Sequence, residues 1–184
     1  MDKKVTAVVP ALNEENTIGD VVKGLRSRVD EVIVVDDGSR DKTPAIAQRE
    51  GAVVISHEKN AGYDKSIDEG FALAAKRGAG IILTFDADGQ HNPDDIPRLI
   101  APILTGKADL VVGRRPYKAR ITEYLFAFIA RMKAGVDDPL CGLKSYDVKV
   151  YNDVGYFDRL ASIGTELMFR AGKKGYRIAQ IDIQ

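Results

Sequence analysis

The chain has 184 residues, 45% of them hydrophobic and 29% charged, an ordinary composition for one globular domain. Lysine and arginine number 27 together, as do aspartate and glutamate; a protein built to bind nucleic acid is normally basic, so we expect no nucleic-acid partner. Cys141 is the only cysteine, which excludes an internal disulfide and a cysteine-based zinc site and favours a reducing, cytoplasmic compartment.

Short apolar runs alternate with helical periodicity along the first two-thirds of the chain, which predicts an α/β fold with a mostly parallel sheet flanked by helices. We expect strands at residues 5–9, 32–35, 53–55, 81–85 and 110–112. We expect helices from residue 18, from residue 43, over 65–77 and from residue 92. The later part departs from this alternation, with a helix at 121–133, an irregular stretch, a helix at 165–174 and a last strand at 177–183. One domain spans residues 1–184 in this interpretation.

Polar segments follow three of the expected strands, where an open parallel sheet binds its ligands. They are PALNE (residues 10–14), DDGS (36–39) and DADGQH (86–91). The first strand leads neither to a Gly-x-Gly-x-x-Gly turn nor to a glycine-rich phosphate loop. Nucleotide phosphates would therefore need another source of positive charge, and the acidic residues imply a bridging cation.

Asp86 and Asp88 follow a buried strand in a turn that contains glycine. Two neighbouring carboxylates repel each other unless a cation binds beside them, and hard oxygen ligands suit Mg²⁺ or Mn²⁺. The alternative is a solvated turn in which Asp88 or Asn92 caps the next helix.

Two further pairs follow other strands. Asp36 and Asp37 could accept hydrogen bonds from a base or a ribose, or could form an Asx-turn into the next helix. Arg114 and Arg115 stand where guanidinium groups could meet phosphate oxygens, or they could be an ordinary surface pair.

The segments VVPALNE (8–14), VVDDGS (34–39) and FDADGQH (85–91) together resemble the family-2 inverting glycosyltransferases. Within that family the chain is most similar to the dolichyl- and polyprenyl-phosphate hexose synthases. Further matches are GRR at 113–115, Asp138 with GLKSY at 142–146, and Glu166 with Arg170-Ala171 ahead of Gly175-Tyr176. The resemblance implies a single-domain GT-A fold, with a nucleotide-sugar-binding half at 1–115 and an acceptor-side half at 116–184.

The resemblance also implies residue roles. The nucleoside pocket would be lined by Pro10, Ala11, Leu12, Glu14, Val35 and Asp37. The diphosphate and a Mg²⁺ or Mn²⁺ ion would be surrounded by Asp86, Ala87, Asp88 and Gln90, with Asp88 and Gln90 the expected ligands. Arg115 would reach a phosphate of the donor or the acceptor. Glu166 and Asp138 are the candidate general bases for a hydroxyl acceptor, whereas a phosphate acceptor is already ionised and needs none.

The sequence departs from the polyprenyl-type pattern in two places. Those synthases often have Asn-x-Gly-Lys-Gly-Ala after the third strand, where this chain has Asn60-Ala61-Gly62-Tyr63-Asp64-Lys65. The sequence also ends at Gln184, ahead of the basic segment with which those synthases cover the donor, so it is either truncated or lacks that segment.

We therefore expect an enzyme that transfers a hexose from a UDP- or GDP-sugar, with inversion and a divalent metal. The apolar segment 121–133, flanked by basic residues, favours a polyprenyl phosphate acceptor and peripheral contact with the inner face of a membrane, although a buried core helix is an alternative. Two other functions stay open. One is a haloacid-dehalogenase-like phosphatase with Asp86 as nucleophile, although Gln90 replaces its usual threonine or valine; the other is a non-catalytic nucleotide-binding module.

Overall fold

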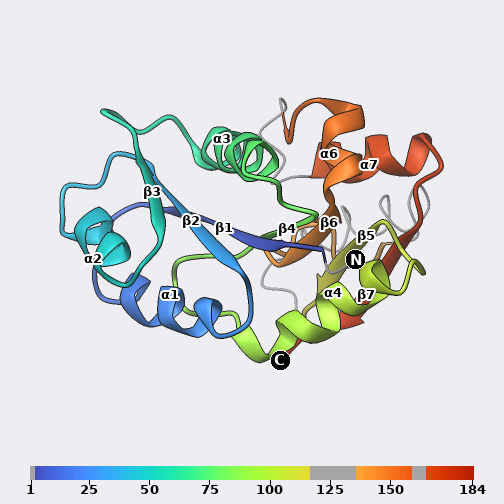
Figure 1. Cartoon of the computed structure of the whole chain (residues 1–184), viewed down its shortest axis with the longest axis horizontal. Coiled ribbons are helices and arrows are strands. Elements are labelled where there is room, and N and C mark those ends of the chain that lie inside the picture. The colour runs from blue at the N-terminus through green and yellow to red at the C-terminus, as the bar shows by residue number, and fades with distance from the viewer. Residues whose placement is uncertain (1–2, 117–135, 159–164) are drawn as a thin grey trace.

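The computed structural model describes residues 3–116, 136–158 and 165–184. Within them, seven strands form one sheet in the order β3-β2-β1-β4-β6-β5-β7 (Figure 1). The strands are β1 (Val5–Ala11), β2 (Glu31–Asp36), β3 (Val53–Ser56), β4 (Ile81–Thr84), β5 (Leu110–Arg114), β6 (Lys144–Asp147) and β7 (Ile178–Asp182). All neighbouring pairs are parallel except those of β6, which runs antiparallel to β4 and β5.

Helices cover both faces of this sheet. They are α1 (Ile18–Arg26), α2 (Thr43–Arg49), α3 (Tyr63–Lys76), α4 (Ile96–Leu104), α6 (Val148–Val154) and α7 (Thr165–Lys173), with a short 3₁₀ helix at Pro93–Asp95. In Figure 1, α1, α2 and α4 lie along one face, and α3, α6 and α7 lie along the other. The predicted α/β class, with a mostly parallel sheet flanked by helices, is confirmed. Among the described residues, no helix is long and apolar enough to cross a bilayer.

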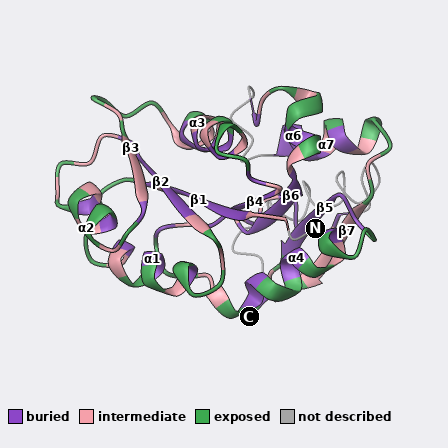
Figure 2. Ribbon diagram, viewed as in Figure 1, coloured by how far each residue is buried: buried purple, intermediate pink, exposed green. Residues whose placement is uncertain are grey.

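The core lies between the sheet and its two helical layers, where Figure 2 shows the strands largely buried. Residues 32–35 of β2 are all buried, as expected of a strand covered on both faces. The expected apolar face of α1 is buried too, with residues at positions i, i+3, i+4 and i+7: Ile18, Val21, Val22 and Leu25. Local hydrophobic patterning therefore accounts for these elements.

Strand β6 and helix α6 occupy the stretch that we expected to be irregular. The sequence of β6, Lys-Ser-Tyr-Asp, has no apolar run, yet all four residues are buried. Ser145 donates a hydrogen bond to the carbonyl of Leu99, and Tyr146 packs edge-on against Phe71 with ring centroids 5.4 Å apart. Contacts distant in sequence thus stabilise a strand that local pattern does not indicate. The helix expected at 121–133 lies outside the described residues.

Candidate active site

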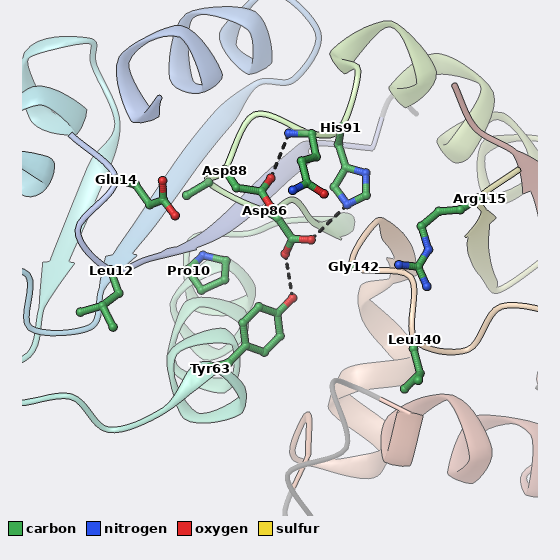
Figure 3. Close-up of a pocket in the computed structure, with 12 residues that line it drawn as sticks. Pro10, Leu12, Glu14, Tyr63, Asp86, Asp88, His91, Arg115, Leu140 and Gly142 are labelled. Carbon is green, nitrogen blue, oxygen red and sulfur yellow. Dashed lines mark hydrogen bonds and ion pairs between the residues drawn. The ribbon is translucent and has the colours of Figure 1, made fainter. Parts of the chain in front are cut away.

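The carboxyl ends of β1 and β4 open into a cleft of about 490 Å³ (Figure 3). One wall comes from the end of β1, from the segments that follow β1 and β4, and from Tyr63 at the start of α3. The opposite wall comes from Arg115, after β5, and from Leu140 and Gly142, ahead of β6. The described residues that line the cleft are Pro10, Leu12, Glu14, Tyr63, Asp86, Ala87, Asp88, Gln90, His91, Arg115, Leu140 and Gly142.

A second cavity of about 300 Å³ adjoins the cleft on the side of β2. Its lining consists of Pro10, Ala11, Leu12, Asp37, Asn60, Gly62, Tyr63 and Ser66. Both cavities share Pro10, Leu12 and Tyr63 as lining residues. The two spaces therefore meet along a common wall, with Asp37 on one side of it and Asp86 on the other.

Asp86 is held by hydrogen-bonding side chains at both of its carboxylate oxygens. Tyr63 donates its hydroxyl to Oδ1 over 3.1 Å, and His91 Nε2 lies 3.1 Å from Oδ2 (Figure 3). Burial alone would raise the pKa of Asp86, but the contacts with His91 and Tyr63 and the charge of buried Lys144 outweigh it and lower that pKa. The carboxylate thus stays ionised in one fixed orientation.

Asp88 and Gln90 lie in the turn beyond Asp86. The Gln90 backbone N–H donates to Asp88 Oδ1 over 2.9 Å, and both residues line the cleft together with Glu14. Within the described ranges, no group of three His, Cys, Asp or Glu side chains is arranged to hold a metal ion. A few hard oxygen ligands facing an open cleft nevertheless fit a Mg²⁺ or Mn²⁺ ion that takes its other ligands from substrate phosphates.

Asp37 accepts three hydrogen bonds beside the second cavity. Ala61 N–H and His57 Nδ1 lie 2.6 and 2.8 Å from Oδ1, and Gly62 N–H lies 3.0 Å from Oδ2. Burial would raise the pKa of Asp37, but these hydrogen bonds outweigh it and lower the pKa. The neighbouring Asp36 accepts a hydrogen bond from the backbone N–H of Ser39, three residues further on, over 3.2 Å.

Arg115 points into the cleft (Figure 3) and is anchored by buried Asp138. Its Nε and Nη2 donate to the two oxygens of Asp138 over 2.8 and 3.0 Å. Both oxygens of Asp138 are therefore occupied by a guanidinium, which makes this residue a poor candidate for a general base. Arg114 instead forms ion pairs with Asp182 and Asp137 and is absent from the cleft lining.

Most of the residues expected from the sequence come together at the two cavities. The exceptions are Val35, Glu166 and Asp138, the last of which is bonded to Arg115 and lines neither cavity. Val35 is fully buried in β2, and its side chain packs towards Gly70 of α3. Glu166, in the first turn of α7, is absent from the cleft lining and accepts hydrogen bonds from Tyr156 and Arg170 over 3.0 and 2.8 Å.

Sequence reasoning gave no role to four residues that line the cleft: Tyr63, His91, Leu140 and Gly142. His91 and Gly142 belong to segments that carry the family resemblance, and Tyr63 interrupts the loop pattern of the polyprenyl-type synthases, whereas Leu140 carried no signal. A methyl group built at Gly142 would lie 2.0 Å from Asp86 Oδ2. That position needs glycine because the backbone passes directly over the carboxylate.

Comparison with known proteins agrees with this architecture. Residues 6–162 match the model of the glycosyl transferase family 2. The chain is 33% identical to a UDP-N-acetylglucosamine–dolichyl-phosphate N-acetylglucosaminyltransferase of Methanococcus voltae, over 79% of this chain and 70% of that protein. It is 31% identical to a dolichyl-phosphate hexose transferase of Haloferax volcanii, over 97% of this chain and 81% of that protein.

Among solved structures, the fold superposes with a TM-score of 0.82 on glucosyl-3-phosphoglycerate synthase of Mycobacterium tuberculosis, crystallised with Mn²⁺, UDP and phosphoglyceric acid. The two sequences are 26% identical, over 98% of this chain and 68% of that one. The chain is thus a member of glycosyl transferase family 2, with the GT-A fold of its structural neighbours. The predicted family and the predicted enzyme class are both confirmed.

Proposed function

We propose that this glycosyltransferase moves a hexose from UDP- or GDP-hexose to a polyprenyl phosphate, with inversion at the anomeric carbon and with Mg²⁺ or Mn²⁺. The observation that carries the proposal is the charge of the main cleft. Three carboxylates, Glu14, Asp86 and Asp88, line it opposite the Arg115 guanidinium. A diphosphate entering such a cleft would be repelled by the carboxylates unless a cation came with it.

The two cavities divide the donor between them in this proposal. The nucleoside would lie in the smaller cavity beside Asp37, and the diphosphate would lie in the main cleft, between the Asp86 turn and Arg115. Asp88 and Gln90 would hold the metal ion, which would stabilise the charge that develops on the leaving diphosphate. The mycobacterial synthase was crystallised with UDP and Mn²⁺ together, which supports this choice of donor and cation.

The residues of the chain would then work mainly by positioning and by charge. Arg115, oriented by Asp138, would donate hydrogen bonds to a phosphate of the donor or the acceptor. A polyprenyl phosphate brings an oxygen that is already ionised, so its attack would need no general base. Under this proposal neither Asp138 nor Glu166 acts as a base, and Glu166→Gln should keep transfer to a phosphate acceptor.

The polyprenyl phosphate is supported by the names of the two relatives, both of which act on dolichyl phosphate. It is supported also by the apolar, basic-flanked segment 121–133, which lies outside the described residues. The lipid would bring the protein to the cytoplasmic face of a membrane. Flotation of the chain with vesicles that contain polyprenyl phosphate, compared with vesicles of neutral lipid, measures this association, and no binding to either would contradict it.

Transfer itself is tested with the purified chain, Mn²⁺ and a panel of UDP- and GDP-hexoses. One arm supplies polyprenyl phosphate and a second supplies phosphoglyceric acid, so that a lipid acceptor is distinguished from a small phosphorylated acid. Product that forms only in the first arm, that disappears with a chelator and that has the inverted anomeric configuration by NMR supports the proposal. Saturable donor binding without transfer in either arm would instead favour a non-catalytic module, and release of phosphate from small phosphoesters would favour a phosphatase.

A further inference from the structure

Tyr63 stands at the boundary between the nucleoside cavity and the diphosphate cleft. It is the first residue of α3, and it belongs to the lining of both cavities. The other two shared residues, Pro10 and Leu12, bring only apolar side chains. A nucleotide that occupied both cavities would have to pass this wall, and Tyr63 would be the residue of the wall that offers it a polar side chain.

The loop before Tyr63 is fixed from the nucleoside side. Asp37 accepts hydrogen bonds from the backbone N–H groups of Ala61 and Gly62, over 2.6 and 3.0 Å. Gly62 has φ +96° and ψ 155°, a conformation that residues with a side chain rarely adopt. The Asp37 carboxylate, the loop that it holds and Gly62 together fix the position at which α3 begins. They thereby direct the Tyr63 ring towards the cleft.

The Tyr63 hydroxyl is the second side-chain hydrogen-bond partner of the Asp86 carboxylate, besides His91. It donates to Oδ1, while Oδ2 lies beside His91 Nε2 and against the backbone of Gly142. A carboxylate held at one oxygen only could rotate about its χ2 torsion, which is broad for aspartate. The phenol therefore supplies the second point that fixes the plane of the Asp86 carboxylate.

We propose that Tyr63 is a donor-positioning residue with two separable parts: its hydroxyl orients Asp86 towards the cation that would accompany the diphosphate, and its ring forms the wall that separates the nucleoside from the diphosphate. The inference rests on the proposed function, because it needs a nucleotide that spans both cavities. It goes further in two respects. It assigns one residue to both halves of the donor site, and it makes the contribution of Asp86 depend on an orientation that the Tyr63 hydroxyl sets.

The experiment separates the hydroxyl from the ring. Binding of uridine, guanosine, UDP with Mn²⁺ and GDP with Mn²⁺ is measured by calorimetry for the wild type, Tyr63→Phe, Asp86→Asn and the double variant. Tyr63→Phe should bind the preferred nucleoside like the wild type and should bind its diphosphate with Mn²⁺ about ten- to a hundredfold more weakly, the loss expected for one hydrogen bond to a charged group. The double variant should bind no more weakly than Asp86→Asn alone, because the hydroxyl acts through Asp86.

A further variant and a control variant distinguish the role of Tyr63 from a general loss of folding. Tyr63→Gln keeps a hydrogen-bond donor but removes the ring, so it should weaken nucleoside binding, which Tyr63→Phe should leave unchanged. Tyr176→Phe is the matched control, because Tyr176 donates its hydroxyl to Asp153 over the same 3.1 Å, and neither residue lines the two cavities. This control should bind every ligand as the wild type does.

Each other result has a distinct meaning. Undiminished binding of the diphosphate by Tyr63→Phe, or additive losses in the double variant, would overturn the role of Tyr63 while leaving the proposed function intact. Equal losses for nucleoside and diphosphate in Tyr63→Phe would mean that the hydroxyl merely supports the fold, which also overturns the inference. A wild type that binds neither UDP nor GDP would overturn the proposed function and this inference with it.

Discussion

Arg115 and Asp138 form a two-point ion pair at the edge of the cleft, with Nε and Nη2 of the guanidinium on opposite oxygens of the carboxylate. The Arg115 backbone N–H also donates to Asp138 Oδ2, over 3.2 Å. The Asp138 side chain is only 2% exposed, whereas that of Arg115 is 29% exposed. A buried anion thus fixes the direction of a cation that faces the solvent-filled cleft.

Replacing Asp138 should therefore impair transfer by releasing Arg115. In Asp138→Asn only one amide oxygen can accept from the guanidinium, so we expect the rate of transfer to fall about tenfold or more while nucleoside binding persists. The free energy of unfolding should fall by about 1–3 kcal/mol. Steady-state kinetics and urea denaturation measure the two effects. Arg114→Lys is the control, since Arg114 pairs with Asp137 and Asp182 away from the cleft, and transfer within about twofold of the wild type is expected there.

Asp88→Ala should abolish metal-dependent donor binding and leave the fold intact. Asp88 lines the cleft, and its described hydrogen bond is a local one, from Gln90 N–H, so its loss removes a proposed metal ligand without opening the core. Thermal shift with UDP or GDP, with and without Mn²⁺, measures binding through the stability it adds. Asp94→Ala, which removes a carboxylate exposed on the following 3₁₀ helix, should keep the Mn²⁺-dependent shift. An unchanged shift in Asp88→Ala would show that the metal lies elsewhere.

Gly142→Ala should disturb Asp86 without a change of charge. The new methyl group would lie 2.0 Å from Oδ2, so the carboxylate must move away from Tyr63 and His91. We expect donor binding with Mn²⁺ to weaken about tenfold or more, because the carboxylate loses its set orientation. Calorimetry with UDP or GDP and Mn²⁺ measures the change.

The matched control for that substitution is Gly172→Ala in α7. There a methyl group would meet Ile178 at an ordinary 3.5 Å, and alanine in a helix is about 0.5–1 kcal/mol more favourable than glycine. Gly172→Ala should therefore bind donor as the wild type does and should unfold at a slightly higher temperature. Equal donor binding by the two glycine variants would contradict the role given to Gly142.

The His57–Asp37 contact should make stability depend on pH. The hydrogen bond with Asp37 raises the pKa of His57 above its usual 6.5, and the pKa of Asp37 is lowered below 3.8. A raised histidine pKa adds stability that is fully present below pH 6.5 and is lost as the pH rises through the folded value. The lowered Asp37 pKa adds stability that is present above pH 3.8 and is lost as the pH falls through the folded value.

The free energy of unfolding lost in His57→Gln should therefore be greatest between about pH 4 and pH 6.5 and should shrink as the pH rises further. Urea denaturation of both proteins from about pH 4 to about pH 9 measures this difference. Glu69→Gln should weaken the effect, because Glu69 Oε2 lies 2.8 Å from His57 Nε2 and contributes to the raised pKa. A loss in His57→Gln that stayed constant with pH would contradict the charged contact.

The fold was predictable where hydrophobic pattern is local. The apolar runs of β1, β2 and β4 and the spacing of Ile18 to Leu25 in α1 indicate buried strands and an amphipathic helix in any context. Strand β6 was not predictable, because its sequence has no apolar run and includes Lys144, whose ammonium is buried near Asp86 and Asp138 and whose pKa is lowered by that burial. Its antiparallel pairing with β4 and β5 joins segments about sixty and thirty-four residues apart, which no local period encodes.

The sequence by itself determined which carboxylates and guanidinium would gather, because the ends of parallel strands meet at one edge of the sheet: Asp37, Asp86, Asp88 and Arg115. It could not determine their partners. Tertiary structure decided that Tyr63 and His91 hold Asp86, that Asp138 orients Arg115, and that Val35 faces α3 rather than the cavity beside Asp37. The physical reason is that the burial of an apolar strand such as β1, β2 or β4 follows from its own residues, whereas side-chain contacts depend on how α3, β5 and β6 are placed around it.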